Sequence, residues 1–232
     1  MVCDFRVVAC SILIKTDVDV IVSNAVVVLK RLVQLQLSTQ IPMGSTSKHS
    51  PLSIIAHLAR RIDDIKHAQA RACVTWLVGQ YAADEDDGPG PEGIADWAPD
   101  VLRKLAKSFV SEVTLVKLQV VTLAGKLLVL SPDDVRIGKL VKYVFAQARY
   151  DRDWDVRDRG RMLSSLVVGM VGKGIDEVVK GGGVSKKEER VGVVLRREQV
   201  RMVLFEGKRV GLEEVDREDG VLSLFFFIFV TK

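Results

Sequence analysis

Residues 111–149 read SEVTLVKLQVVTLAGKLLVLSPDDVRIGKLVKYVFAQAR, and this stretch decides the fold class. Its apolar residues recur every three or four positions on either side of a short polar break at 131–134, as the buried face of a helix requires. The positions are Val116, Val120, Leu123, Leu127 and Leu130 before the break, and Ile137, Val141, Val144 and Ala148 after it. We therefore expect two helices, joined so closely that they are antiparallel neighbours.

Residues typical of helix N-termini precede both helices. Ser111 is a candidate N-cap for the first helix. For the second, Ser131 offers a capping hydroxyl and Pro132 suits the first helical position, while Asp133 and Asp134 would face the positive end of the helix dipole. We expect the second helix to begin at Pro132.

The same periodicity continues outward in both directions, and no segment up to residue 170 alternates as a strand would. We expect about seven helices, mostly of 12 to 20 residues, in that part of the chain. Their predicted inward positions are Val18, Ile21, Ala25, Val28 and Leu32; Ile55, Leu58 and Ile62 after a start at Pro51; Cys73, Trp76, Leu77 and Tyr81; and Val101, Leu102, Leu105 and Phe109. The predicted fold is all-α, an α-solenoid of stacked antiparallel helical hairpins of the HEAT or armadillo kind. A compact helical bundle is the competing architecture, and periodicity does not separate the two.

The composition divides the chain into three parts. Residues 1–16 form an N-terminal segment that we do not assign, and residues 17–171 form the helical-repeat region. Polar, glycine- and proline-containing stretches predict flexible loops near 38–50 and 82–97. Residues 172–232 are glycine-rich and charged.

Within this last part we expect one helix at 196–208 and an apolar, phenylalanine-rich terminus. The terminal run VLSLFFFIFV at 221–230 has about half of the roughly 20 residues that a membrane-spanning helix needs. The earlier run VVACSILI at 7–14 follows charged residues and lacks a clear cleavage site, so we do not expect a signal peptide.

Charge and cysteine content narrow the function classes. The net charge of +4 is modest, although residues 82–98 hold six acids and no base and the rest therefore carries +10. A dedicated nucleic-acid binder would gather its bases on one face, which the sequence does not indicate. Cys3, Cys10 and Cys73 form no CxxC pair, so we expect neither a disulfide framework nor a zinc site. A reducing, cytosolic setting fits best.

No motif predicts catalysis or a cofactor. The segment GMVGKG at 169–174 lacks both the first glycine and the final Ser or Thr of a phosphate-binding loop. His49, His57 and His67 have no metal-binding spacing, and the nucleophile motif GxSxG is absent. We expect no catalytic, metal-binding or cofactor-binding residues, and we do not predict an enzyme.

The densest charge cluster, YDRDWDVRDRGR at 150–161, could be a calcium loop, a phosphate site or a helix start. A calcium loop needs glycine where Val156 stands and glutamate where Met162 stands, so that interpretation fails. In a phosphate site, the neighbouring carboxylates would compete with the phosphate for every arginine except Arg161. We expect instead that Asp155 caps a helix beginning at Val156, and that Arg157 and Arg159 bridge carboxylates. The predicted buried stripe of that helix is Leu163, Leu166, Val167 and Met170.

Four stretches together resemble the trunk of beta-adaptins, above all the beta subunits of the third adaptor-protein complex. They are ARACVTWLVGQYA at 70–82, APDVLRKLAKSFVSE at 98–112, LVKLQVVTLAGKL at 115–127 and YDRDWDVRDRGRML at 150–163. Their order and spacing are also similar to the family, and the resemblance covers about residues 17–170. We expect a fragment of such a trunk, without the hinge and ear that carry clathrin-binding and accessory-binding functions in the family.

The resemblance implies a non-enzymatic scaffold subunit of a heterotetrameric vesicle-coat adaptor complex. Its expected partners are the second large, the medium and the small adaptor subunits, with a small GTPase at the membrane and no nucleic acid. The implied location is peripheral on Golgi or endosomal membranes, in sorting toward the lysosome or vacuole. The alternatives are another helical-repeat scaffold of the transport-receptor type and a basic helical-repeat nucleic-acid binder.

Overall fold

The computed structural model describes residues 51–82, 94–167 and 195–206, together with the helical residues Asn24, Ala25, Val28 and Lys30. Most of the helix predicted from Asp17, the loop near 38–50 and the phenylalanine-rich terminus lie outside the described residues.

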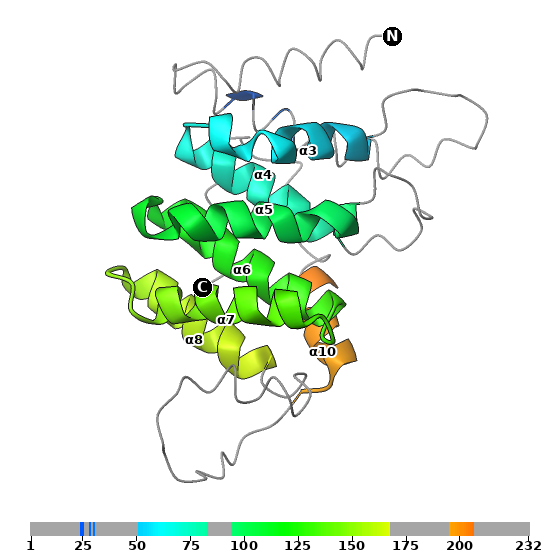
Figure 1. Cartoon of the computed structure of the whole chain (residues 1–232), viewed down its shortest axis with the longest axis vertical. Coiled ribbons are helices and arrows are strands. Elements are labelled where there is room, and N and C mark those ends of the chain that lie inside the picture. Colours follow the sequence, from blue (N-terminus) through cyan, green and yellow to red (C-terminus); the bar gives the residue numbers. More distant parts are fainter. Residues whose placement is uncertain are drawn as a thin grey trace, which may run out of the picture.

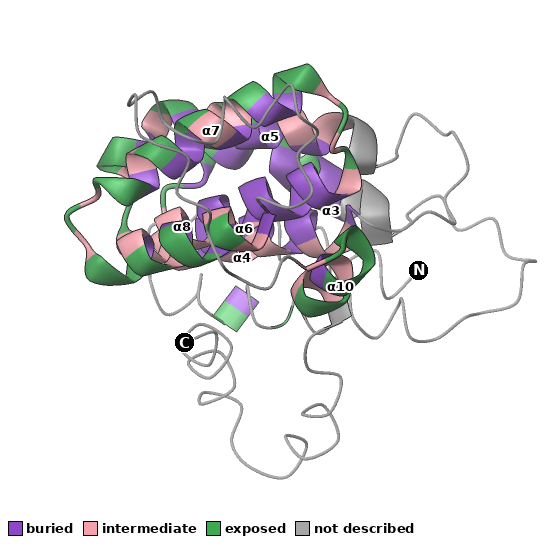
Figure 2. Ribbon diagram, turned by 90° about the horizontal axis from the view of Figure 1, so that it is seen from below, coloured by how far each residue is buried: buried purple, intermediate pink, exposed green. Residues whose placement is uncertain are grey.

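Six helices form the body of the described chain. They are α3 (Pro51–Arg60), α4 (Ala68–Tyr81), α5 (Ile94–Ser108), α6 (Thr114–Leu130), α7 (Val135–Arg149) and α8 (Trp154–Val167). Figure 1 shows them stacked one after another, and Figure 2 shows that α5 and α7 form one layer and α4, α6 and α8 the other. The described residues contain no strand, and the predicted all-α stack of hairpins is confirmed.

Two 3-10 turns connect helices of the two layers. The first, η1 (Ile62–Asp64), joins α3 to α4, and the second, η2 (Phe109–Ser111), joins α5 to α6. Both begin with a fully buried side chain, Ile62 or Phe109, which fixes the turn to the core. These residues were predicted to lie inward on helices; they do lie inward, but on the connecting turns.

Helix α6 is the centre of the core because it packs against α4 on one side and α8 on the other. Val116, Val120, Leu123 and Leu127 are buried as predicted, whereas Leu130 is only half-buried. The remaining sides of this helix are also largely buried, which explains why most residues of 115–130 are apolar. The predicted inward face of α7 is buried in full.

Helix α4 corrects a prediction about its buried face. Of the four predicted inward residues only Leu77 is fully buried, while Cys73, Trp76 and Tyr81 are half-buried. The small side chains of the helix lie deepest instead: Ala70, Ala72, Val74 and Val78. Helix α4 contacts α3, α5 and α6, so its buried residues lie on several sides. A single stripe of large residues therefore could not predict them.

The predicted helix starts were less accurate than the helices themselves. Ser111 ends η2, and the N-cap of α6 is Val113, which offers no side-chain bond. Helix α7 begins at Val135 because the Asp134 carboxylate accepts a hydrogen bond from the backbone N–H of Arg136 at 2.8 Å, so Pro132 lies in the turn. Helix α5 begins at Ile94, within the stretch predicted as a loop, and continues through Pro99.

A last helical segment lies outside the hairpin stack. Helix α10 (Arg197–Arg201) continues into a π-helical turn, η4 (Met202–Glu206), within the stretch where a helix was predicted at 196–208; residues 207 and 208 lie outside the described residues. It lies against the layer that contains α4 and α6 (Figure 2). In the described part of the chain, no helix combines the length and the apolar character needed to cross a bilayer.

Candidate functional site

The side chains that could support catalysis or metal binding do not form a site in the described residues. No group of three or more His, Cys, Asp or Glu residues is arranged to hold a metal there. His57 is exposed on α3 and His67 is half-buried just before α4, while His49 lies outside the described residues. Burial of the thiol raises the pKa of Cys73 to about 12, against the opposing charge of Lys30, which favours the protonated thiol over the nucleophilic thiolate.

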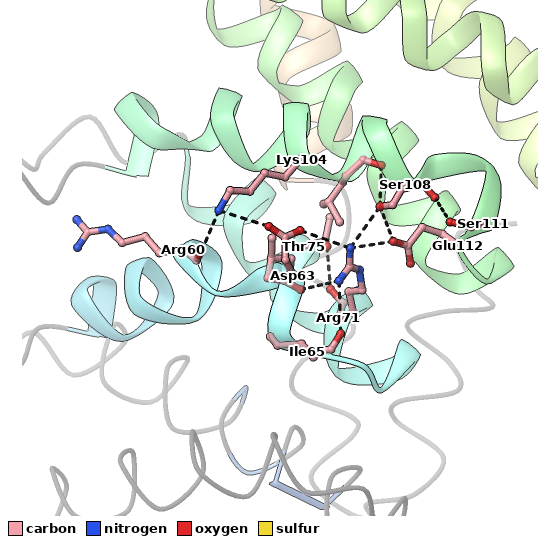
Figure 3. A network of polar contacts seen from close by, with 11 residues as sticks. Arg60, Asp63, Ile65, Arg71, Thr75, Lys104, Ser108, Ser111 and Glu112 are labelled. Atoms are coloured by element: carbon pink, nitrogen blue, oxygen red, sulfur yellow. Dashed lines mark hydrogen bonds and ion pairs between the residues drawn. The ribbon is translucent and has the colours of Figure 1, made fainter.

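The most extensive polar network in the described chain surrounds Arg71, a buried residue of α4 (Figure 3). Its Nη1 donates to the carbonyl oxygen of Ile62 at 2.6 Å and to that of Ile65 at 3.4 Å. Its Nη2 lies 2.8 Å from Oε1 of Glu112 and 3.3 Å from Oγ of Ser108. One guanidinium therefore joins the α3–α4 turn to the end of α5 and the start of α6.

Two further contacts extend this network. The Ser108 hydroxyl donates to the Glu112 carboxylate at 2.6 Å, so this carboxylate has both a charged and a neutral donor. Lys104 donates to the backbone oxygen of Arg60 at 2.9 Å and lies 3.7 Å from Asp63 (Figure 3). Because the contacts of Arg71 with Glu112 and Ser108 and that of Lys104 with Arg60 link consecutive hairpins, the network fixes their relative orientation.

The charge cluster at 150–161 forms a second junction, between the α7–α8 turn and α6. The Asp151 carboxylate lies 2.7 Å from the Lys117 ammonium, and the Asp153 carboxylate accepts from the Thr114 hydroxyl at 2.9 Å. Burial alone would raise the pKa of Asp151, but hydrogen bonds from Lys117 and from backbone N–H groups outweigh it and lower this pKa. Asp151 is therefore held in its charged form.

The helix start in this cluster differs from the prediction by two residues. Helix α8 begins at Trp154, and the capping carboxylate is that of Asp153, which accepts from the backbone N–H of Asp155 at 2.9 Å. Two carboxylates two residues apart are equivalent as sequence signals. Only Asp153 is also held by Thr114 of the neighbouring helix.

Two arginines of the cluster, Arg157 and Arg159, turn toward the protein, whereas Arg152 and Arg161 are exposed. Arg157 donates to the backbone oxygens of Asp151 and Arg152 at 2.7 and 3.1 Å, so the prediction that it bridges carboxylates was wrong. Arg159 donates to the Thr122 hydroxyl of α6 at 3.3 Å; burial lowers its pKa, and the charge of Asp155 opposes that effect. Of the predicted buried stripe, Leu163 and Val167 are buried, Leu166 is half-buried and Met170 lies outside the described residues.

A third polar site, absent from the sequence predictions, centres on Lys126 of α6, which is only 3% exposed. Its ammonium donates to Oε1 of Gln80 at 2.9 Å and lies 4.9 Å from the centre of the Phe205 ring. Gln80 in turn donates to the backbone oxygen of Phe205 at 3.2 Å. Burial lowers the pKa of Lys126 to about 8.

Sequence reasoning missed Arg71 and Lys126 for a shared reason. Each is a single base within an apolar helix, and its partners are up to 79 residues away along the chain. The available signal was the placement of a base among residues that all face the core, as in ARACV and LAGKLL.

An apolar edge is formed by four exposed side chains at two turns. Val110 and Val113 belong to the connection before α6, and Tyr150 and Trp154 to the α7–α8 turn; each is between 55% and 81% exposed. The Thr114–Asp153 and Lys117–Asp151 contacts bring these two turns side by side. We refer to these four residues as the apolar edge.

Comparisons with known proteins agree on one family. The sequence matches the model described as the adaptin N terminal region over residues 11–169. The AP-3 complex subunit beta-2 of Mus musculus is 39% identical over 150 residues, which are 65% of this chain and 12% of that protein. The human AP-3 complex subunit beta-1 is 34% identical over 173 residues, which are 75% of this chain and 13% of that protein.

The similarity extends to distant organisms. The AP-3 complex subunit beta of Dictyostelium discoideum is 29% identical over 194 residues, covering 65% of this chain and 17% of that protein. The chain thus spans only 12% to 17% of the length of these relatives.

Proposed function

The chain belongs to the adaptin N-terminal region family, and from this we propose that it acts as a non-enzymatic scaffold in the trunk of an adaptor-complex β subunit of the AP-3 type. The observation that carries the proposal is the family match over residues 11–169, which includes all of α3 to α8. The relatives are named as subunits of the AP-3 complex. The corresponding role here is in vesicle-mediated protein transport.

The described contacts support a scaffold role because they fix helices to one another. The Arg71 network joins the α3–α4 hairpin to the α5–α6 hairpin, and the Asp151–Lys117 and Asp153–Thr114 contacts join the α5–α6 hairpin to the α7–α8 hairpin. Such a stack holds its outer surfaces in a constant arrangement. A scaffold needs this so that its partners bind at fixed positions relative to one another.

The proposed partners are the second large, the medium and the small adaptor subunits. Membrane association would then be peripheral and come through the complex, on Golgi or endosomal membranes, with a small GTPase as a further partner there. Sorting toward the lysosome or vacuole is the proposed direction of transport.

Co-purification of the full chain tests this function. We expect a tagged chain, expressed in cells of its own organism, to recover the other three adaptor subunits in stable proportions. Recovery of a folded chain with none of these subunits would overturn the proposal. Recovery of nucleic acid, lost as the salt concentration rises, would support the basic nucleic-acid binder instead.

The apolar edge offers a more specific variant for the same experiment. Exposed, clustered apolar side chains often mark interaction surfaces, and tyrosine and tryptophan are enriched there. We expect a chain with Tyr150→Ala and Trp154→Ala to recover less of the adaptor subunits while keeping its helical content. The matched control is Tyr143→Ala, an exposed tyrosine on α7 away from the α7–α8 turn, which should recover them as the unaltered chain does.

A further inference from the structure

Residues 195–206 contact polar groups of the hairpin stack that have too few partners within their own helices. Arg197 donates from Nε to the backbone oxygen of Val129 and from Nη2 to that of Leu130, each at 2.8 Å. Both oxygens belong to the last turn of α6, where a helix leaves its carbonyl groups without donors of its own. A guanidinium at this position also faces the negative end of the helix dipole. Arg197 therefore caps the C-terminus of α6 from outside the stack.

The other end of the segment completes a second polar site. The backbone oxygen of Phe205 accepts from Gln80 at 3.2 Å, and its ring faces the Lys126 ammonium at 4.9 Å. Gln80 belongs to α4 and Lys126 to α6, so Phe205 lies at the junction of these two helices. A buried ammonium is costly without partners, and Phe205 supplies one of the contacts that reduce this cost.

Apolar contacts connect these two ends. Val200 is fully buried, and Leu195, Leu204 and Phe205 pack half-buried against the core. Arg197 and Val200 are three residues apart, which places them on one side of α10, and Leu204 follows in the π-helical turn η4. The residues between Arg197 and Val200, Glu198 and Gln199, are exposed. The segment thus turns Val200, Leu204 and Phe205 toward the stack, while Met202 and Val203 are exposed.

Several features separate this segment from the repeats. Turns of four residues join α6 to α7 and α7 to α8, whereas residues 168–194 lie between α8 and the segment. The family match ends at residue 169, before the segment begins. A five-residue helix followed by one π-helical turn is far too short to be stable by itself, so docking on the stack is what keeps it folded.

We propose that the face of α4 and α6 around Gln80, Lys126 and the last α6 carbonyls is a docking site for a short amphipathic helix. Its occupant is residues 195–206 of the same chain, held as an exchangeable intramolecular ligand. Recognition uses an arginine on the α6 C-terminus, an apolar face, and an aromatic ring over Lys126. This inference goes beyond the adaptor function, and co-purification of adaptor subunits reports on that function separately.

A labelled peptide with the sequence of residues 195–206, LRREQVRMVLFE, tests the proposal when titrated into the full chain. In the unaltered chain the covalent connection keeps residues 195–206 at an effective concentration on the order of millimolar. The added peptide must compete with this resident segment, so it should bind weakly. In a chain with Arg197→Ala and Phe205→Ala the resident segment is weakened. We expect the peptide to bind this variant at least about tenfold more tightly.

Two controls establish specificity. A chain with Glu198→Ala, which alters an exposed residue of α10, should bind the peptide as the unaltered chain does. A peptide that itself carries Arg197→Ala and Phe205→Ala should not bind the opened chain. Equal affinity of the original peptide for the unaltered and the Arg197→Ala, Phe205→Ala chains would overturn the proposal, as would binding of the altered peptide with unreduced affinity.

Hydrogen exchange on the unaltered chain gives an independent test that does not depend on any substitution. If the segment is exchangeable, its amides should lose protection in an opening event that leaves those of α6 protected. Loss of protection by residues 195–206 and α6 in one common event would show that the segment is an integral part of the stack, and would overturn the proposal.

Discussion

Arg71 is the residue on which we expect the stability of the described stack to depend most strongly. Its charge is buried, its partner Glu112 has a side chain only 12% exposed, and the two carbonyl oxygens of the α3–α4 turn also rely on it. Removing one member of a buried ion pair leaves the other without compensation. We expect Arg71→Ala to lower the free energy of unfolding by about 3 to 5 kcal/mol, measured by chemical denaturation.

A surface ion pair on α5 is the control for this prediction. Arg103 and Asp100 are 2.7 Å apart, but both side chains are more than half exposed. Arg103→Ala should therefore cost at most about 1 kcal/mol. An Arg71→Ala variant as stable as Arg103→Ala would show that the Arg71 network does not hold the hairpins together.

Lys126 should make stability depend on pH in the alkaline range. Burial lowers its pKa from 10.5 to about 8, so between these values the unfolded chain binds a proton that the folded chain does not. The free energy of unfolding should rise with pH across this window, because the cost of burying the charge disappears. The full change corresponds to about 3 kcal/mol.

Comparison with Lys126→Met isolates this contribution. The raised pKa of Cys73 has the opposite effect on alkaline stability, but it is common to both chains and cancels in their difference. We expect the unaltered chain to gain stability relative to Lys126→Met between pH 8 and 10.5, measured by denaturation at each pH. For Lys139→Met, an exposed lysine of α7, the same comparison should show little change with pH. A Lys126 difference independent of pH would contradict the assignment.

At the scale of helices, the sequence predicted which segments are helical far better than where each begins. Periodicity reflects the buried face, which many residues determine together. A helix start depends on a single acceptor, and several neighbouring residues offer one. Asp134 caps α7 where Ser131 was expected, and Asp153 caps α8 where Asp155 was expected. In the α8 case, the choice is made by a neighbouring helix, through Thr114, which local sequence does not reveal.

The crossing of α7 and α8 depends on a glycine. A Cβ atom on Gly160 would lie 3.0 Å from the Cβ of Ala148, closer than nearly all such contacts, so one helix would have to move. Alanine is favoured over glycine within a helix by about 1 kcal/mol, and crowding a packed core costs about 1 to 3 kcal/mol. We expect Gly160→Ala to lower the free energy of unfolding by about 1 kcal/mol, measured by denaturation.

Two further variants test the cause. On Gly125 of α6 a Cβ atom would meet Leu163 at 3.7 Å, an ordinary contact, so Gly125→Ala should be neutral or stabilising by up to about 1 kcal/mol. Adding Ala148→Gly to Gly160→Ala should recover part of the lost stability, because it removes the atom in the way. If Gly160→Ala were as stable as Gly125→Ala, the close approach would not limit the packing of α7 and α8.

At the scale of the whole molecule, local patterns predicted the stack of hairpins but not what joins one hairpin to the next. The Arg71 guanidinium reaches Glu112, 41 residues on, and Arg197 reaches back to Val129. No residue spacing announces such contacts, because each depends on how the helices pack. The division of the chain into segments 1–16, 17–171 and 172–232 stays a prediction.

The stacked arrangement predicts which helices lose stability when one buried side chain is shortened. In a stack, stability comes mainly from contacts between neighbouring repeats. Leu123 lies in α6, which packs against both α4 and α8, and a Cβ placed on Gly79 of α4 would meet it at 3.3 Å. Leu163 of α8 packs toward Gly125 of α6, near the end of the described stack. Each is about 1% exposed, so each substitution by alanine should cost about 2 to 5 kcal/mol.

The two substitutions should differ in where the structure loosens, which hydrogen exchange measures helix by helix. We expect Leu123→Ala to reduce amide protection in α4, α6 and α8 together, since it removes packing between the two sides of the stack. Leu163→Ala should reduce protection mainly in α7 and α8 and leave α4 close to its original protection. The same pattern of lost protection in both variants would mean that the described helices unfold as one cooperative unit, and it would contradict the prediction that damage is confined to neighbouring helices.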